Sequence, residues 1–180
     1  AVGYNAGLAM TTGASNTIIG GLAGDALTTG SDNVAIGANA LSTEDTGGRN
    51  VAVGRGTLQN QNVDSSAYNV AIGYEAGNDI TTGVNNVIMG GLAGDALTTG
   101  AYNIAIGYQA LSSEDTGSTS IGIGYYALQA QNNAANNYNI GIGHSAGAAI
   151  STGIQNTLIG GLAGDALTTG SYNQAFGYIA

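Results

Sequence analysis

The sequence predicts an all-β fold, a parallel β-solenoid (β-roll) built from 17/19-residue coils. Three observations carry this prediction: a long verbatim repeat, a regularly spaced glycine that follows an apolar residue, and a short β-branched segment before each such glycine. Together they indicate a chain that contributes one short strand per coil and stacks each coil on the one before it.

The repeat has two levels. The undecapeptide Gly-Gly-Leu-Ala-Gly-Asp-Ala-Leu-Thr-Thr-Gly occurs verbatim at 20–30, 90–100 and 160–170. A shorter unit is marked by an apolar residue followed by glycine, and these marker glycines are Gly3, Gly20, Gly37, Gly54, Gly73, Gly90, Gly107, Gly124, Gly143, Gly160 and Gly177. Their spacings are 17, 17, 17 and 19, the same four again, and then 17 and 17. We therefore predict about eleven coils, four to each 70-residue superrepeat.

The whole chain, 1–180, is predicted to form a single solenoid segment. Its superrepeats are 3–72, 73–142 and a partial third at 143–180. Because the chain begins and ends inside the repeating motif, we expect it to be a segment of a longer fibre.

The strand of each coil is predicted immediately before the marker glycine. In Asn33-Val34-Ala35-Ile36-Gly37, β-branched residues alternate with a small one and a glycine ends the run. No window has a helical stripe, and glycine every few residues opposes a helix. Parallel strands stacked about 4.8 Å apart would give a rod roughly 50 Å long.

Two columns of identical residues run along the predicted rod. Asparagine stands four places before the marker glycine, with Ser120 as the exception, and the column comprises Asn16, Asn33, Asn50, Asn69, Asn86, Asn103, Asn139, Asn156 and Asn173. Stacked side-chain amides donate and accept hydrogen bonds along an axis, so we expect a structural ladder. Alanine stands three places after the glycine, which indicates a position where only a small side chain fits. The extra residues of the longer coils, near 60–66 and 129–136, are expected to bulge as loops.

A third column lies two places before the marker glycine and contains no polar residue. Its members are Ile18, Ala35, Ala52, Ala71, Ile88, Ala105, Gly122, Gly141, Leu158 and Ala175. If Val34 and Ile36 face inward, this column faces outward. A strand face in contact with water normally carries polar residues, and this column has none. We therefore expect an interchain apolar column and a homo-oligomer. The alternative is cover by the second half of the same coil, and the opposite parity would expose the valines and isoleucines instead.

Composition excludes several classes of function. Charged residues make up 7% of the chain, against roughly 25% in soluble domains, and 11 acidic residues face only Arg49 and Arg55, for a formal net charge of −9. Nucleic-acid binding and docking on anionic lipid both depend on Lys and Arg. No run approaches the ~18 apolar residues of a membrane span. We expect no nucleic-acid partner and no membrane insertion.

Few residues suggest chemistry. The segment 20–27 is similar to the Ca²⁺-binding nonapeptide motif, but its aspartate recurs only once in each superrepeat, too far apart to share an ion. The adjacent carboxylates Glu44-Asp45 and Glu114-Asp115 are of a type used in acid–base catalysis, although a solvated acidic turn explains them better. His144 replaces a tyrosine and is interpreted as a surface aromatic, and most of the ten tyrosines as core or interface packing. We predict no enzyme activity, no metal and no cofactor.

A threonine column raises the alternative of an ice-binding solenoid. Such surfaces need outward threonines in a Thr-x-Thr arrangement, whereas the pairs Thr28-Thr29 and Thr98-Thr99 are adjacent, so one of each points away. The longer coils also interrupt the column.

The strand phrases resemble those of known fibrous proteins. The units at 33–37, 69–73 and 103–107 are similar to the Ser-Val-Ala-Ile-Gly strand of trimeric autotransporter adhesin heads, and the phrase at 27–37 resembles tail-fibre proteins of marine bacteriophages. The resemblance implies a left-handed parallel β-roll assembled as a homotrimer. The 17/19 period and Asn in place of Ser depart from the adhesin pattern.

These observations lead to one expected function and three alternatives. We expect a structural fibre or shaft, a segment of a phage tail fibre or adhesin on the virion or at the cell surface, that projects or mediates host attachment. A self-assembling extracellular filament, a module that binds a host cell-surface glycan or protein, and the ice-binding solenoid are the alternatives.

Overall fold

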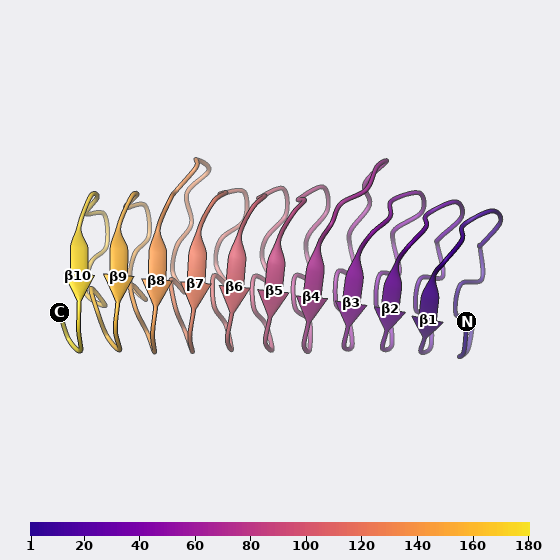
Figure 1. The fold of residues 1–180 in the computed structure, drawn as a ribbon, viewed down its shortest axis with the longest axis horizontal. Coiled ribbons are helices and arrows are strands. Elements are labelled where there is room, and N and C mark those ends of the chain that lie inside the picture. The colour runs from indigo at the N-terminus through magenta and orange to yellow at the C-terminus, as the bar shows by residue number, and fades with distance from the viewer.

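The computed structural model describes residues 1–180 and is an all-β parallel solenoid without a helix (Figure 1). Ten strands of three residues each pair in parallel in one sheet, in the order of the chain from β1 to β10. They are β1 (Thr17–Ile19), β2 (Val34–Ile36), β3 (Val51–Val53), β4 (Val70–Ile72), β5 (Val87–Met89), β6 (Ile104–Ile106), β7 (Ile121–Ile123), β8 (Ile140–Ile142), β9 (Thr157–Ile159) and β10 (Gln174–Phe176). About nine turns of chain connect them, which confirms the predicted fold class.

The register of the sheet follows the repeat. Strand partners keep the shorter spacing of the marker glycines, as in Val34↔Val51, and take the longer spacing only at β3–β4 and β7–β8, as in Val51↔Val70 and Ile121↔Ile140. Figure 1 shows that the loops leading into β4 and β8 project beyond the other loops. The longer coils therefore place their extra residues outside the stack and leave the register of the strands intact.

Hydrogen bonds join each coil to the next around its whole circumference. Of 108 backbone–backbone hydrogen bonds, only 18 lie within the strands, so the turns contribute most of the pairing between coils. The Gly24 N–H, for example, donates to the Ala40 carbonyl at 2.9 Å, and the Thr28 N–H donates to the Asp45 carbonyl at 2.8 Å. The solenoid is thus held together by its backbone as much in its turns as in its sheet.

The turns use left-handed backbone at fixed positions. The second residue after the marker glycine has a positive φ, including Leu22 at 57°, Asn39 at 58° and Glu75 at 52°. This conformation costs an L-residue roughly 1–2 kcal/mol. In return it aims the N–H at the neighbouring coil, where the Leu22 N–H donates to the Tyr4 carbonyl at 2.8 Å.

The marker glycine meets the next coil too closely for any side chain. Gly20 has φ of +133°, and a Cβ placed on it would lie 2.5 Å from the Gly37 carbonyl oxygen. Because the same approach repeats up the stack, only glycine fits this column.

The asparagine column forms the predicted ladder, but mainly with backbone groups. Asn33 Oδ1 accepts the N–H of Asn50 at 3.0 Å, and Asn33 Nδ2 donates to the Gly47 carbonyl at 3.0 Å, so one side chain ties two points of the following coil. Direct amide–amide bonds also occur, as from Asn50 Nδ2 to Asn33 Oδ1 at 3.2 Å. Ser120, the exception in the column, still accepts a bond at its hydroxyl from Gln131 Nε2 at 2.8 Å.

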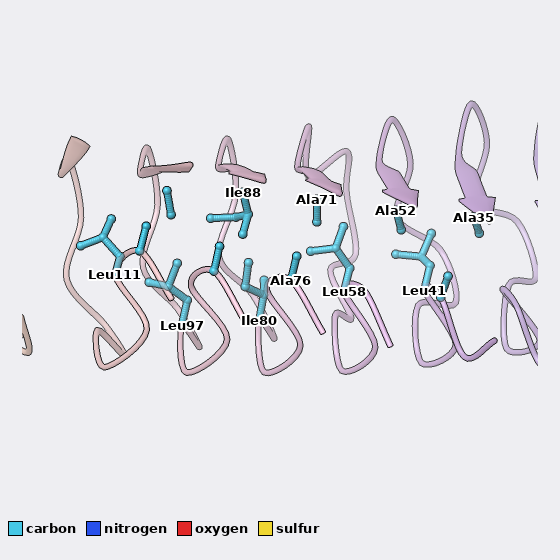
Figure 2. Packing of buried hydrophobic residues seen from close by; sticks show 14 of the residues in the cluster. Ala35, Leu41, Ala52, Leu58, Ala71, Ala76, Ile80, Ile88, Leu97 and Leu111 are labelled. Atoms are coloured by element: carbon cyan, nitrogen blue, oxygen red, sulfur yellow. The ribbon is translucent and has the colours of Figure 1, made fainter. Parts of the chain in front are cut away.

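The core contains the middle residue of each strand, the column that we expected between chains. The middle residues Ile18, Ala35, Ala52, Ala71, Ile88, Ala105 and Leu158 are 0–2% exposed and pack inside the solenoid; Gly122 and Gly141 are also buried, and the terminal Ala175 packs against the same cluster. Figure 2 shows Ala35, Ala52, Ala71 and Ile88 pointing toward leucines and isoleucines from the opposite turn. The expectation of an interchain column at these positions is therefore wrong, because the second half of the same coil covers them.

Two kinds of core layer alternate and explain the four-coil superrepeat. In one kind, Ile80 or Leu97 fills the interior and a glycine stands opposite; a Cβ on Gly77 would lie 2.9 Å from Ile80 Cδ1. In the other, a buried leucine such as Leu41 or Leu58 takes the glycine's place, and a polar residue replaces the isoleucine. Two layers of each kind follow one another along the chain, so the pattern repeats every four coils.

We predict that Asn86→Ala lowers the free energy of unfolding by roughly 2–4 kcal/mol, because it leaves the Asn103 N–H and the Gly100 carbonyl buried without partners. Urea unfolding followed by circular dichroism measures the change. The matched control is Asn85→Ser. Asn85 is exposed, and the equivalent residue of an earlier coil is Ser15, which has the same backbone conformation. The free energy of unfolding of this control should stay within about 0.5 kcal/mol of the parent's. Equal losses in both variants would refute the ladder.

Candidate functional site: the outward face of the sheet

The outer face of the sheet is formed by the first and third residues of every strand. Seventeen of these twenty positions are apolar and none is charged, although the chain carries a net charge of −9. The three polar members are Thr17, Thr157 and Gln174, all near the ends of the sheet. We call these twenty residues the outer sheet face.

The outer sheet face is continuous and only partly covered. The exposed fraction is 43% at Ile19 and 37% at Met89 and Ile159, and most other members are half-buried by their neighbours in adjacent strands. Ten strands at about 4.8 Å spacing and three residues of about 3.3 Å rise give a strip of roughly 45 by 10 Å. This continuous strip of mainly β-branched side chains is the candidate interaction surface of the chain.

Aromatic residues border this strip on both sides. One column lies two residues past the end of the strand and holds Tyr4, Tyr74, Tyr108, Tyr125, His144 and Tyr178. The other lies two residues before the strand and holds tyrosine in alternate coils, as Tyr68, Tyr102, Tyr138 and Tyr172. All nine of these tyrosines are exposed, so the first of the two expected locations, the core, does not apply to them.

Where aromatic residues fall in consecutive coils they stack along the rod. The ring centroids of Tyr108 and Tyr125 are 5.5 Å apart with planes at 21°, and those of Tyr125 and His144 are 5.3 Å apart at 5°. Tyr126 packs beside Tyr125 at 4.0 Å. His144 therefore acts as a surface aromatic, as predicted, in a row whose ring spacing is set by the rise of the coils.

Both arginines also interact with tyrosines. The Arg55 guanidinium lies 5.5 Å from the centre of the Tyr74 ring, donates to its hydroxyl at 3.0 Å and contacts Glu75 at 3.4 Å. Arg49 makes a similar contact with Tyr68 at 5.6 Å. Each arginine also has one carboxylate nearby, Asp32 at 3.8 Å from Arg49 and Glu75 at 3.4 Å from Arg55, and neither arginine belongs to the outer sheet face.

The paired carboxylates are not the solvated turns that we expected. Glu44 and Glu114 are fully buried, each at the polar core layer of its superrepeat. Glu44 accepts hydrogen bonds from Gln61 Nε2 at 2.9 Å, from the Gly47 N–H at 2.8 Å and from the Val63 N–H at 3.3 Å. Because Val63 belongs to the longer coil, the loop of that coil serves to bring donors to a carboxylate inside the core.

Glu114 repeats this arrangement in the next superrepeat with one additional donor. It accepts from Gln131 Nε2 at 2.8 Å, from the Gly117 N–H at 2.8 Å and from the Asn133 N–H at 3.4 Å, and the additional donor is Asn137 Nδ2 at 2.9 Å. The sequence held a signal for both sites, because Gln61 and Gln131 occupy, in the following coil, the same position as Glu44 and Glu114.

Burial raises the pKa of the Glu44 carboxyl above its ordinary value, although the bonds from Gln61, Gly47 and Val63 oppose the shift. Neither Glu44 nor Glu114 opens onto a pocket, since the single pocket of the structure is lined by other residues. The geometry assigns both carboxylates to the packing of the longer coils.

The acidic residues do not gather into a metal site. No group of three or more His, Cys, Asp or Glu side chains lies close enough to hold an ion. One oxygen of each of Asp25, Asp45 and Asp95 is buried without a hydrogen-bond partner.

The structure has no helix with the length and hydrophobicity that a membrane span requires.

Comparison of the chain with protein-family models, with curated proteins and with solved structures finds no match. The surfaces of the chain itself are therefore the basis for assigning a function.

We predict that the raised pKa of Glu44 makes the stability of the protein depend on pH in the acid range. A carboxyl whose folded-state pKa lies above its unfolded value stabilises the fold below about pH 4.5, and this contribution is lost as pH rises through the folded-state pKa. The free energy of unfolding of the parent, relative to Glu44→Gln, should fall as pH is raised across that window in urea titrations.

Asp64→Asn controls for the loss of one negative charge, because Asp64 is exposed in the long loop. The assignment would be contradicted if the free energy of unfolding of the parent, relative to Glu44→Gln, rises with pH. It would also be contradicted if Asp64→Asn gives the same pH dependence as Glu44→Gln.

Proposed function

We propose that this chain is a structural rather than a catalytic protein, a shaft segment of an extracellular or virion fibre that projects or presents a host-binding part. The observation that carries the proposal is the continuous apolar outer sheet face on a solenoid whose length grows by about 4.8 Å with each coil. The resemblance of the strand phrases to adhesin heads and phage tail fibres favours a place on the virion or the cell surface.

Stiffness supports a role as a spacer. Each coil bonds to its neighbour in the strand, in the turns and through the buried asparagine ladder, so bending the rod would break bonds on one side of every coil. Such proteins behave as one-dimensional stacks, in which additional repeats extend the rod without changing the fold of the existing ones.

The occupant of the outer sheet face is proposed to be another copy of this chain. A second copy has the same rise per coil, so its valine and isoleucine rows meet those of the first at one spacing along the whole rod. The absence of charge on the face keeps like charges out of the contact between two chains that each carry a net charge of −9. Tyrosines at both borders match the aromatic enrichment of protein interfaces.

The area of the face sets the strength of this association. A strip of roughly 450 Å² is smaller than the ~800 Å² that each partner buries in a standard stable interface. In a cyclic homotrimer, the arrangement that the adhesin resemblance implies, each chain contacts two neighbours around the axis and buries more of the bordering tyrosines. We therefore propose a homotrimer whose stability increases with the number of coils.

We predict that Ile106→Glu combined with Ile123→Glu converts the assembly to monomers while the β-sheet circular dichroism signal is retained. Both residues lie in the middle of the outer sheet face and point away from the core, so the charges oppose association without disturbing the fold. Analytical ultracentrifugation across a range of concentrations measures the mass.

Thr99→Glu is the matched control, because Thr99 is exposed in the turn and lies outside the sheet. It should leave the mass unchanged. A parent chain that remains monomeric at every concentration tested, or a double variant with the parent's mass, would contradict the proposal.

A further inference from the structure

The surface has one pocket, and it lies where the first long loop meets the two preceding coils. Its volume is about 220 Å³, and its lining includes Ser31, Asp32, Thr46, Arg49, Ser65 and Ser66. The residues come from the turns that precede β2, β3 and β4. No hydrophobic side chain lines it, which is unusual for a small-molecule pocket in any protein.

Arg49 is held in place at this pocket but is not saturated. Its Nη1 donates to Ser66 Oγ at 2.7 Å and to the Tyr68 hydroxyl at 3.1 Å, and its guanidinium lies over the Tyr68 ring. Its Nε is 3.8 Å from Asp32 Oδ2, a loose ion pair in which both side chains are about half exposed. Since a guanidinium has five N–H donors, several remain available to a ligand, and the half-exposed Asp32 carboxylate beside it can accept hydrogen bonds from the same ligand.

The fold does not require this arrangement. One superrepeat later the coil has the same backbone, with φ of 62° at Arg49 and 63° at Thr119, and the isolated bridge Gly48↔Ser66 recurs as Ser118↔Asn136. The charged pair is replaced there by Tyr102 and Thr119, and no pocket forms. The pocket of the first superrepeat is thus an addition to a scaffold that is stable without it.

We propose that this pocket binds one neutral sugar unit of a glycan. A carboxylate that accepts, a guanidinium that donates and hydroxyls that do both suit neighbouring hydroxyl groups of a sugar ring. An apolar ligand has nothing to contact, and an anion meets a chain of net charge −9 whose Arg49 is already paired with Asp32. The volume is below the roughly 300–1,000 Å³ of pockets for drug-sized ligands, which fits one ring.

A single shallow polar site binds weakly, so affinity would come from the copies on neighbouring chains around a fibre. This inference does not depend on the proposed structural role, because the pocket is formed within one chain and lies outside the outer sheet face.

Saturation-transfer difference NMR on the whole segment tests the proposal with glucose, galactose, mannose, N-acetylglucosamine and N-acetylgalactosamine at millimolar concentration, and with glucuronate and sialic acid as charged probes. The parent should transfer saturation to at least one neutral sugar and more weakly to the charged ones. Arg49→Thr and Asp32→Tyr, which introduce the residue types of the next superrepeat, should each reduce the signal at least fivefold.

Arg55→Thr is the matched control, since Arg55 makes the same kind of tyrosine contact but lines no pocket. It should keep the parent's signal, and all variants should keep the parent's thermal unfolding within a few degrees. The absence of transfer to every neutral sugar, a stronger response to the charged probes, or an undiminished signal in Arg49→Thr would each overturn the proposal.

Discussion

Each coil of this solenoid depends on hydrogen bonding to the coils on either side. The interior is too narrow for a thick core, and its largest fully buried apolar side chains are leucines and isoleucines that meet alanines across the coil. Backbone N–H and C=O groups in the turns are therefore close to the core and need partners, which only the neighbouring coil offers. The glycine column, the asparagine ladder and the left-handed residues all meet this one requirement.

The superrepeat adds a second constraint to the first. In the coils with a leucine in the left-handed turn position, Leu41 and Leu58, the core residue three places later is polar, Glu44 or Gln61, and these two side chains bond to each other. A buried carboxylate needs several donors, and the longer coil supplies them from its loop. Core composition and loop length are thus linked, which is why both recur with the period of the superrepeat.

Much of the fold could be predicted from the sequence, because a fixed period leaves few architectures open. The strand positions, the asparagine ladder and the protruding loops are confirmed. The interchain role predicted for the middle column was wrong, because the sequence left the parity of Val34-Ala35-Ile36 open and the structure places Ala35 inside the coil. The burial of Glu44 and Glu114 was missed, because a Glu-Asp pair looks solvated until its donors in the following coil are known.

The division between constrained and free columns also shapes the surface. The glycine and asparagine columns, which contact the backbone of the next coil, barely vary. The column that contains Asp32, Arg49, Tyr68 and Asn85 holds residues of very different kinds, because it requires only a left-handed backbone and an outward side chain. A rod of this kind is able to carry different surface chemistry on successive coils over one unchanging apolar face. We regard this combination as the basis of a fibre that assembles through its sheet and presents other groups outward.

Disulfide cross-linking in this cysteine-free chain would show which face the copies share. Residues near the axis of a cyclic homo-oligomer approach their own copies, so Ile106→Cys should form an interchain disulfide under mild oxidation, which requires Cα atoms roughly 4.4–6.8 Å apart. Ala105→Cys, which points into the core, and Thr99→Cys, which lies in the turn, should remain largely monomeric. Preferential cross-linking through position 99 or 105 would contradict an assembly built on the outer sheet face.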